Sequence, residues 1–269
     1  MLDWANIRKS TALLVAAALV ACVLALCLCS CLPSRGQSGG GSGWTPLYCN
    51  PEGITWENGR VSYTEDGVTA AKTGTDVSEN QGYIDWDSVA ADGIEFAFIR
   101  AGYRGTTEGD LFQDDYFEYN LQFARAAGVE CGVYFFSQAV TEEEAREEAE
   151  FVLQLLAGAQ LDYPVVFDYE QNAAGVEGRI TGMGREESTV IAQAFCEAIE
   201  TGGYDAMLYG NGYDLSNFDY DALDGYGLWY AEYGDYPSCR RPFAVWQYAN
   251  DGQVAGIETA VDMNLDIRG

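Results

Sequence analysis

Residues 163–170 read YPVVFDYE, an apolar run that ends in two acids separated by one residue. The stretch from Val165 to Tyr169 predicts a buried strand. Because residues i and i+2 of a strand face the same side, about 6.5 Å apart, Asp168 and Glu170 are expected to point together at its end. Two carboxylates this close repel, which raises the pKa of one and keeps it protonated near neutral pH. Cleavage of a glycosidic bond requires such an acid.

Similar apolar runs recur on both sides of this strand and alternate with amphipathic runs. The other predicted strands are Gly74–Ser78, Phe96–Ala101, Glu130–Phe136, Ala206–Tyr209, Gly227–Tyr230, Ala244–Tyr248 and Val261–Asp266. Helical patterns cover Trp86–Ala91, Asp114–Ala127, Glu142–Ala157 and Glu187–Thr201. Eight strands with interleaved helices predict an α/β fold, a TIM-like βα barrel with its active site at the C-terminal ends of the strands. We expect an irregular barrel, because the late connections are short and poor in helix.

The N-terminal region predicts a membrane segment over residues 1–32. An uncharged apolar run, Thr11–Leu32, follows Arg8 and Lys9 and is long enough to cross a hydrocarbon core of about 30 Å. The positive-inside rule then leaves the rest of the chain extracytoplasmic, facing the cell wall. A lipoprotein signal cut before Cys22 is the alternative to an uncleaved signal anchor or transmembrane helix. Both alternatives place the barrel outside the cytoplasm, tethered or secreted.

Between this segment and the barrel, two further parts are predicted. Residues 33–43 are rich in Gly and Ser and predict a flexible linker. Residues 44–71 predict a small β extension, because Asn58-Gly59 between two β-type runs is a strong hairpin signal. Residues 72–269 then form the catalytic barrel, whose predicted size of about 200–250 residues leaves no room for a second large domain.

The composition excludes several classes of chemistry. The chain has no histidine, which rules out Ser-His-Asp and Cys-His hydrolases and His-ligated zinc enzymes. General acid–base catalysis must therefore rely mostly on carboxylates. The net charge of -28 opposes binding to nucleic acid. We therefore expect no cofactor, no metal and no nucleic-acid partner.

The acidic run over residues 142–150 invites interpretation as a metal site. Thr141 followed three residues later by Glu144 forms a capping box, and acids in a first turn suit the helix dipole. We expect a solvated helix face instead.

Of the cysteines after the membrane segment, two are expected to be buried thiols, and the sequence leaves open whether the other two form a disulfide. The first pair is Cys131 and Cys196, and the second is Cys49 and Cys239.

Several short segments between residues 74 and 266 form an ordered set. They are Asp76-Val77-Ser78, Gln81-Gly82, Ile84-Asp85-Trp86, Phe98-Ile99-Arg100, Gly132-Val133-Tyr134, Asp168-Tyr169-Glu170, Leu228-Trp229, Trp246-Gln247-Tyr248 and Val261-Asp262-Met263-Asn264. In order and spacing this set resembles glycoside hydrolase family 25, the N-acetylmuramidase lysozymes. The resemblance implies an irregular βα barrel that cleaves the β-1,4 bond between N-acetylmuramic acid and N-acetylglucosamine in peptidoglycan glycan strands. We expect a monomer.

The resemblance also assigns roles to residues. It implies that Glu170 is the general acid and that Asp168 assists the 2-acetamido group of the substrate. Asp76 on the first barrel strand and Asp262 on the last would complete an acidic cluster. Aromatic side chains at strand ends stack on sugar rings, and matching polar residues can hydrogen-bond to them. The expected substrate contacts are Tyr134, Tyr209, Trp229, Tyr233, Gln247 and Arg100.

The chain departs from known patterns at two places. Many members of the family carry Tyr-His-Phe where this chain has residues 134–136, YFF, so any hydrogen bond from that histidine is missing. The related family 18 pattern needs two earlier acids, at positions that Tyr163 and Val166 occupy here. Two other functions remain open: a non-catalytic module that binds cell-wall glycan, and a hydrolase of the same fold that acts on another N-acetylated glycan. A cluster of mutually repelling acids argues against a pure binding module.

Overall fold

The computed structural model describes residues 48–65, 68–69, 71–171 and 177–268. The expected membrane segment and linker lie outside these residues. Within the described part, no helix is both long enough and apolar enough to cross a membrane. The four described cysteines are free thiols, so Cys49 and Cys239 do not form a disulfide in this structure.

The predicted β extension contains a hairpin of strands β1 (Ile54–Glu57) and β2 (Arg60–Glu65). Its turn residues, Asn58 and Gly59, have positive φ angles of 52° and 76°. Asn-Gly adopts such angles readily, and a two-residue turn of this kind matches the twist of a hairpin. A short 3-10 helix, η1 (Pro51–Gly53), precedes the hairpin and a two-residue strand, β3 (Val68–Thr69), pairs with β2.

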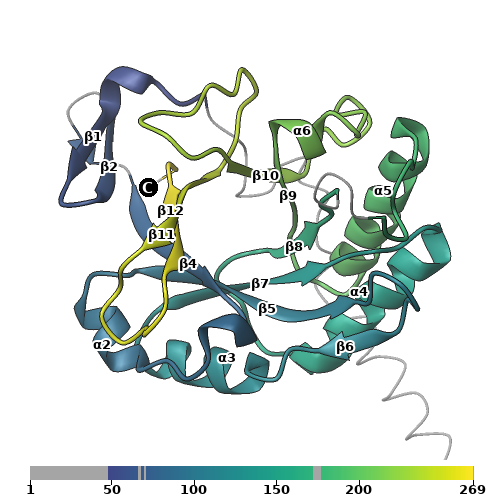
Figure 1. Ribbon diagram of the computed structural model, residues 1–269, viewed down its shortest axis with the longest axis horizontal. Helices are drawn as coiled ribbons and strands as arrows, with labels where there is room; N and C mark the ends of the chain where they lie inside the picture. The colour runs from purple at the N-terminus through teal and green to yellow at the C-terminus, as the bar shows by residue number, and fades with distance from the viewer. Residues whose placement is uncertain (1–47, 66–67, 70, 172–176, 269) are drawn as a thin grey trace, which may run out of the picture. The chain divides into compact units, whose positions relative to one another are not determined.

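Eight strands close into a ring, which Figure 1 shows around the centre of the molecule. In chain order they are β4 (Lys72–Val77), β5 (Phe96–Arg104), β7 (Glu130–Phe136), β8 (Val165–Asp168), β9 (Ala206–Asn211), β10 (Gly227–Ala231), β11 (Val245–Gly252) and β12 (Val261–Asp266). Pairing of β12 with β4, and of β4 with β5, closes the ring. A ninth strand, β6 (Leu111–Gln113), pairs only with the end of β5. The prediction of a barrel-like α/β fold is confirmed.

The last strand makes the barrel irregular. β4 to β11 run parallel around the ring, whereas β12 runs antiparallel to both of its neighbours, β11 and β4. The segment between β11 and β12 is too short for the crossover helix that parallel strands need. The reversal places the beginning of β12 at the same rim as the ends of the other strands. Asp262, the second residue of β12, therefore pairs in register with Asp76 near the end of β4.

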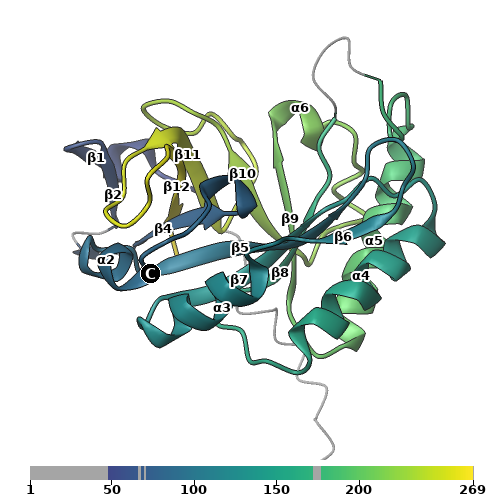
Figure 2. The same ribbon diagram turned by 60° about the horizontal axis from the view of Figure 1, so that its bottom comes forward.

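Helices cover one side of the ring, and the hairpin covers the other (Figures 1 and 2). The helices that follow strands are α2 (Trp86–Ala91), α3 (Phe117–Ala126), α4 (Glu142–Leu156) and α5 (Arg185–Thr201), with two short turns, η2 (Glu79–Gln81) and α6 (Gly212–Leu215), at the rim. The β11–β12 side has no such helix. There the ring of Trp56 from β1 meets the ring of Tyr248 at 5.5 Å.

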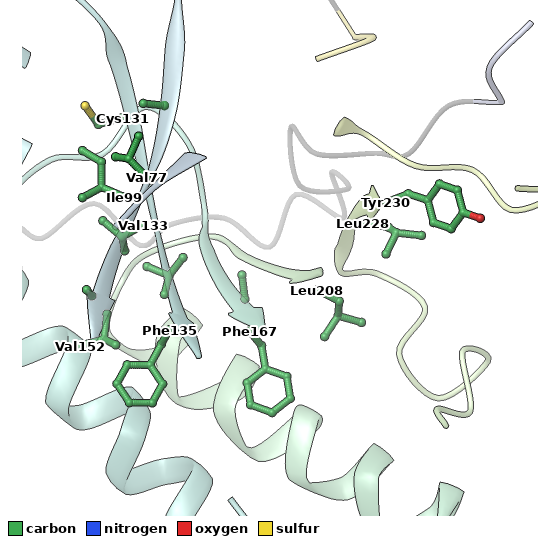
Figure 3. Close-up of a cluster of buried hydrophobic side chains, with 14 of the residues drawn as sticks. Val77, Ile99, Cys131, Val133, Phe135, Val152, Phe167, Leu208, Leu228 and Tyr230 are labelled. Carbon is green, nitrogen blue, oxygen red and sulfur yellow. The ribbon is translucent and has the colours of Figure 1, made fainter. Parts of the chain in front are cut away.

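Two apolar layers hold the barrel. In the outer layer, Phe135 and Phe167 point from β7 and β8 toward helices that include Val152 (Figure 3). Inside the ring, Phe98 stacks on Trp229 with centroids 4.4 Å apart. This stack needs Gly132, because a Cβ there would come within 2.6 Å of the Phe98 ring. The interior of the barrel below the rim is therefore filled by side chains and is not an open pore.

The acidic run of α4 differs in part from its prediction. Thr141 caps the helix as expected, by accepting a hydrogen bond from the backbone N–H of Glu144. The expected solvated face is wrong for Glu148, which is fully buried. Its carboxylate accepts from Arg104 Nε at 2.7 Å and from Ser137 Oγ at 2.6 Å. Ser137 and Arg104 lie 11 and 44 positions before Glu148, outside the helix, so the helical pattern does not reveal them.

Candidate active site

The structure brings together the four predicted acids at the C-terminal rim of the barrel. Asp168 ends β8, and Glu170 follows it two residues later. Asp76 and Asp262 face each other across the β4–β12 pair. The two pairs are close enough for their charges to interact: Glu170 contributes to the raised pKa of Asp76, and Asp262 to that of Glu170. Residues nearly two hundred positions apart thus form one acidic centre.

Burial raises the pKa of every acid in this centre, and repulsion by neighbouring acids adds to it for Asp76, Asp168 and Glu170. Burial and the charge of Asp214 raise the pKa of Glu170 to about 7. Burial raises the pKa of Asp262 to about 6. For Asp168, burial and the charge of Glu170 raise the pKa well above its usual range, and for Asp76 burial and Asp262 do the same. The centre therefore holds protons at neutral pH, and its titration belongs to the group and not to single residues.

No Lys or Arg of the described residues forms an ion pair with these four acids. Arg100, a predicted substrate contact, lies on β5 and is already engaged. Its guanidinium pairs with Asp114 at 2.8 Å and with Glu79 at 3.0 Å. The absence of a cation partner leaves the acids able to exchange protons, which is the property that an acid catalyst needs.

Asp76 is held by two amide side chains. Its Oδ2 accepts from Gln247 Nε2 at 3.0 Å and from Asn264 Nδ2 at 2.7 Å. The carbonyl oxygen of Gln247 in turn accepts from the hydroxyl groups of Tyr209 at 2.9 Å and Tyr233 at 3.2 Å. One network thus fixes the direction of Asp76, and three predicted substrate contacts, Gln247, Tyr209 and Tyr233, belong to it.

The other predicted aromatic contacts lie at different depths. Tyr134 on β7 packs at the edge of the interior cluster, 6.1 Å from Trp229. Trp229 is only 2% exposed, and its indole N–H donates to Asn264 Oδ1 at 2.7 Å. Trp229 therefore positions Asn264, and Asn264 in turn orients the carboxylate of Asp76. Tyr233 is half exposed at the rim. Direct contact of these residues with sugar stays a prediction.

Two residues of the centre were not among the predicted site residues. Asn264, which is fully buried, follows Asp262 on the same face of β12. Asp214 lies in α6, where Asn211 caps the turn by accepting from the backbone N–H of Asp214. One oxygen of Asp214 accepts from the backbone N–H of Gln171 at 2.9 Å, and its other oxygen is buried with no partner among the described residues. The β-strand period could have suggested Asn264, but no local signal marks Asp214.

A cavity of about 450 Å³ opens beside the acidic centre. It is lined by Glu170, Tyr209, Asn211, Gly212, Tyr230, Ala231, Glu232 and Tyr233. Its volume lies within the range of small-ligand sites, and its walls combine aromatic faces with carboxylates. A sugar ring in this cavity would lie next to the carboxyl group of Glu170.

A closed α/β barrel with clustered carboxyl groups beside an aromatic cavity is the arrangement expected of a glycoside hydrolase. The comparison with known families agrees with this class. The chain belongs to glycosyl hydrolases family 25, whose family model matches residues 75–257. The predicted family and enzyme class are thereby confirmed, and the hairpin lies outside the matched region.

Individual relatives extend the comparison. Over 217 residues the chain is 31% identical to the uncharacterized protein YegX of Escherichia coli strain K12, covering 76% of this chain and 70% of YegX. It is 26% identical over 196 residues to the autolytic lysozyme of Clostridium acetobutylicum, covering 71% of this chain but only 54% of that protein. A family 25 glycosyl hydrolase from Bacillus anthracis has a similar structure, with a TM-score of 0.63, 26% identity and coverage of 76% of this chain and 92% of that one.

Proposed function

We propose that the chain hydrolyses the β-1,4 bond between N-acetylmuramic acid and N-acetylglucosamine in peptidoglycan. Family membership and the similarity to a lysozyme support the glycan class. The observation that carries the proposal is the carboxyl group of Glu170, which lines the cavity and whose pKa burial and Asp214 raise to about 7. At neutral pH a large fraction of this group carries the proton that the leaving sugar needs.

In the first step, Glu170 donates its proton to the glycosidic oxygen as the bond to the anomeric carbon breaks. The carbonyl oxygen of the substrate's own 2-acetamido group attacks that carbon and forms a cyclic intermediate, a known exception to the two-carboxylate schemes. In the second step, water attacks the anomeric carbon and gives a proton to the Glu170 carboxylate. The ring of the intermediate reopens, and the enzyme returns to its starting protonation state.

Asp168 acts on the acetamido group in this scheme. Its Oδ1 is buried and has no hydrogen-bond partner among the residues that the structure describes. A buried acceptor without a partner is costly, and an acetamido N–H of the substrate would satisfy it. As the intermediate forms, the positive charge that develops on the acetamido group favours the ionised form of Asp168. Asp76 is held in place by Gln247 and Asn264, and it is near enough to Glu170 for their charges to interact.

Analysis of the products tests the bond that is cut. Purified peptidoglycan is digested with the protein, and the muropeptides are identified by mass spectrometry after reduction. We expect N-acetylmuramic acid at every new reducing end. Reducing ends of N-acetylglucosamine would reject the muramidase assignment and support a same-fold hydrolase of another specificity. Binding to the wall without any new reducing end would support the non-catalytic alternative.

Substrates with different leaving groups test the division of labour. A Glu170→Gln variant lacks the proton donor, so an aryl glycoside whose leaving group needs no proton should restore much of its rate. An Asp168→Asn variant lacks the group that assists the acetamido, so the same substrate should not rescue it. An equal response of both variants would show that the two roles are assigned wrongly.

The expected location is part of the proposal. We propose that the N-terminal segment tethers the barrel to the outer side of the cytoplasmic membrane, on the basis of Arg8, Lys9 and the apolar run Thr11–Leu32. Protease added to intact, wall-stripped cells should then digest the barrel. Full protection in unbroken cells would reject this orientation. Globomycin treatment followed by gel analysis separates the alternatives, because only a lipoprotein cut before Cys22 would accumulate as an uncut precursor.

A further inference from the structure

The hairpin and the barrel enclose a second cavity, separate from the one beside Glu170. It has a volume of about 510 Å³, comparable to small-ligand sites. Three aromatic residues line it: Trp56 from the hairpin, Tyr233 from the β10–β11 connection and Tyr248 from β11. Asn58, Asn250 and Asp251 add polar groups to its walls. The hairpin wall of this cavity lies outside the family match, which begins at residue 75, whereas the facing wall lies within it.

The cavity is held open by fixed contacts. The indole N–H of Trp56 donates to the backbone carbonyl of Asp235 at 2.8 Å, which ties β1 to the β10–β11 connection. At the other end of the hairpin, Arg60 pairs with Asp92 at 2.5 Å. The hairpin therefore does not need to close around a ligand, and the ordering cost of binding is reduced.

Trp56 remains 43% exposed although it is anchored at both its edge and its nitrogen. An aromatic side chain that is fixed but left open to solvent offers a stacking surface for a ring-shaped ligand. The neighbouring Asn250 and Asp251 are exposed and make no side-chain hydrogen bond among the described residues. Stacking faces flanked by free amide and carboxylate groups suit the CH faces and hydroxyl groups of a saccharide.

The position of the hairpin cavity indicates which saccharide it would bind. Tyr233 lines both this cavity and the cavity that contains Glu170. A glycan strand bound at Glu170 and continuing past Tyr233 would therefore enter the hairpin cavity. We propose that the hairpin cavity is an additional subsite, which binds sugar units of the glycan strand beyond those at the point of cleavage. This inference rests on the proposed function.

The test compares long and short substrates in the full chain. For each variant, kcat/KM is measured on polymeric glycan strands and on an aryl glycoside of one N-acetylated disaccharide. We expect Trp56→Ala to lower the ratio of the two values by roughly 10-fold, the effect of losing about 1.4 kcal/mol from one aromatic contact. Tyr83→Ala is the matched control, because Tyr83 is 67% exposed but lines neither cavity, so the ratio should stay unchanged.

A second variant, Asn250→Ala, tests the same subsite in case Trp56→Ala disturbs folding. Asn250→Ala removes a side chain from the facing wall without breaking a described hydrogen bond, and should lower the ratio several-fold with an unchanged melting temperature. Equal loss on both substrates in Trp56→Ala, or an unchanged ratio in Asn250→Ala, would overturn the subsite. If the wild-type protein cleaves neither substrate, the proposed function itself fails. If it cleaves both and no variant changes the ratio, only the subsite is wrong.

Discussion

Glu170, which is partly buried, and Glu148, which is fully buried, both have a pKa raised to about 7, but their surroundings are opposite. Glu148 lies in α4 behind the barrel wall and is paired with Arg104 and Ser137. Glu170 lies at the rim, lines a cavity and has no cation partner in the described part of the chain. Burial raises both values. Ser137 and Arg104 lower the pKa of Glu148. For Glu170 the charges of Asp214 and Asp262 raise the pKa further, and only a hydrogen bond with Asp168 lowers it.

The difference shows that a raised pKa does not by itself identify an acid catalyst. A carboxyl group that is enclosed by its partners stabilises the fold and cannot reach a substrate. One that faces a cavity among other acids has its proton available for transfer. The matched substitutions Glu170→Gln and Glu148→Gln therefore separate the two cases, since each replaces a carboxyl by an amide of equal size.

The largest expected effect is the loss of catalysis in Glu170→Gln. Without the general acid, kcat on peptidoglycan should fall on the order of 10²–10⁴-fold. Binding of glycan should be largely retained, because the amide fills the same space. Glu148→Gln, assayed as folded protein, should keep kcat near the wild-type value. A loss of similar size in both variants would remove the distinction between the two glutamates.

The second effect concerns stability, and here Glu148→Gln is expected to be more damaging than Glu170→Gln. Glu148→Gln breaks a buried pair and leaves Arg104, of its described partners, with Glu147 and two backbone oxygens. Removal of one partner of a buried pair typically costs about 3–5 kcal/mol, and the remaining contacts place the expectation near the lower end, roughly 3 kcal/mol. Urea unfolding at pH 7 measures it. Glu170→Gln should be at least as stable as the wild type, because it removes a repelling charge.

The sequence predicted much of this arrangement, and the failures have physical causes. All eight ring strands were found to within a few residues, because most of them are buried apolar runs bounded by breakers. The reversed direction of β12 was not predicted, since strand pairing is decided by distant partners. Asp214 was missed because only the fold of α6 brings it to Glu170, 44 positions earlier. Glu148 was placed in solvent because its neighbours are charged, although its partner Arg104 lies on β5.

A third effect is the dependence of stability on pH. Because the pKa of Glu170 is about 7 in the folded state and about 4.3 when unfolded, the folded state binds the proton more tightly. The resulting stability is fully present below about pH 4 and is lost as pH rises through about 7. The melting temperature should therefore fall by a few degrees between pH 5 and pH 8, and less so in Glu170→Gln. Glu143→Gln, an exposed change of equal charge, should leave the wild-type slope intact. A parallel slope in both variants would contradict the shift.

The smallest expected effect comes from Asp214, which acts on Glu170 without lying among the predicted catalytic residues. Its charge is, after burial, the main cause of the raised pKa of Glu170, and its hydrogen bond to the Gln171 N–H positions the same segment. Asp214→Asn keeps the hydrogen-bond acceptor but removes the charge. Since the general acid works only when protonated, activity falls as pH rises through its pKa, and this alkaline limb should move to lower pH in Asp214→Asn. Asp221→Asn, an exposed change on the following loop, controls for net charge and should leave the limb in place. A limb that stays at its wild-type pH in Asp214→Asn, measured as kcat/KM between pH 4 and pH 9, would mean that burial alone keeps Glu170 protonated.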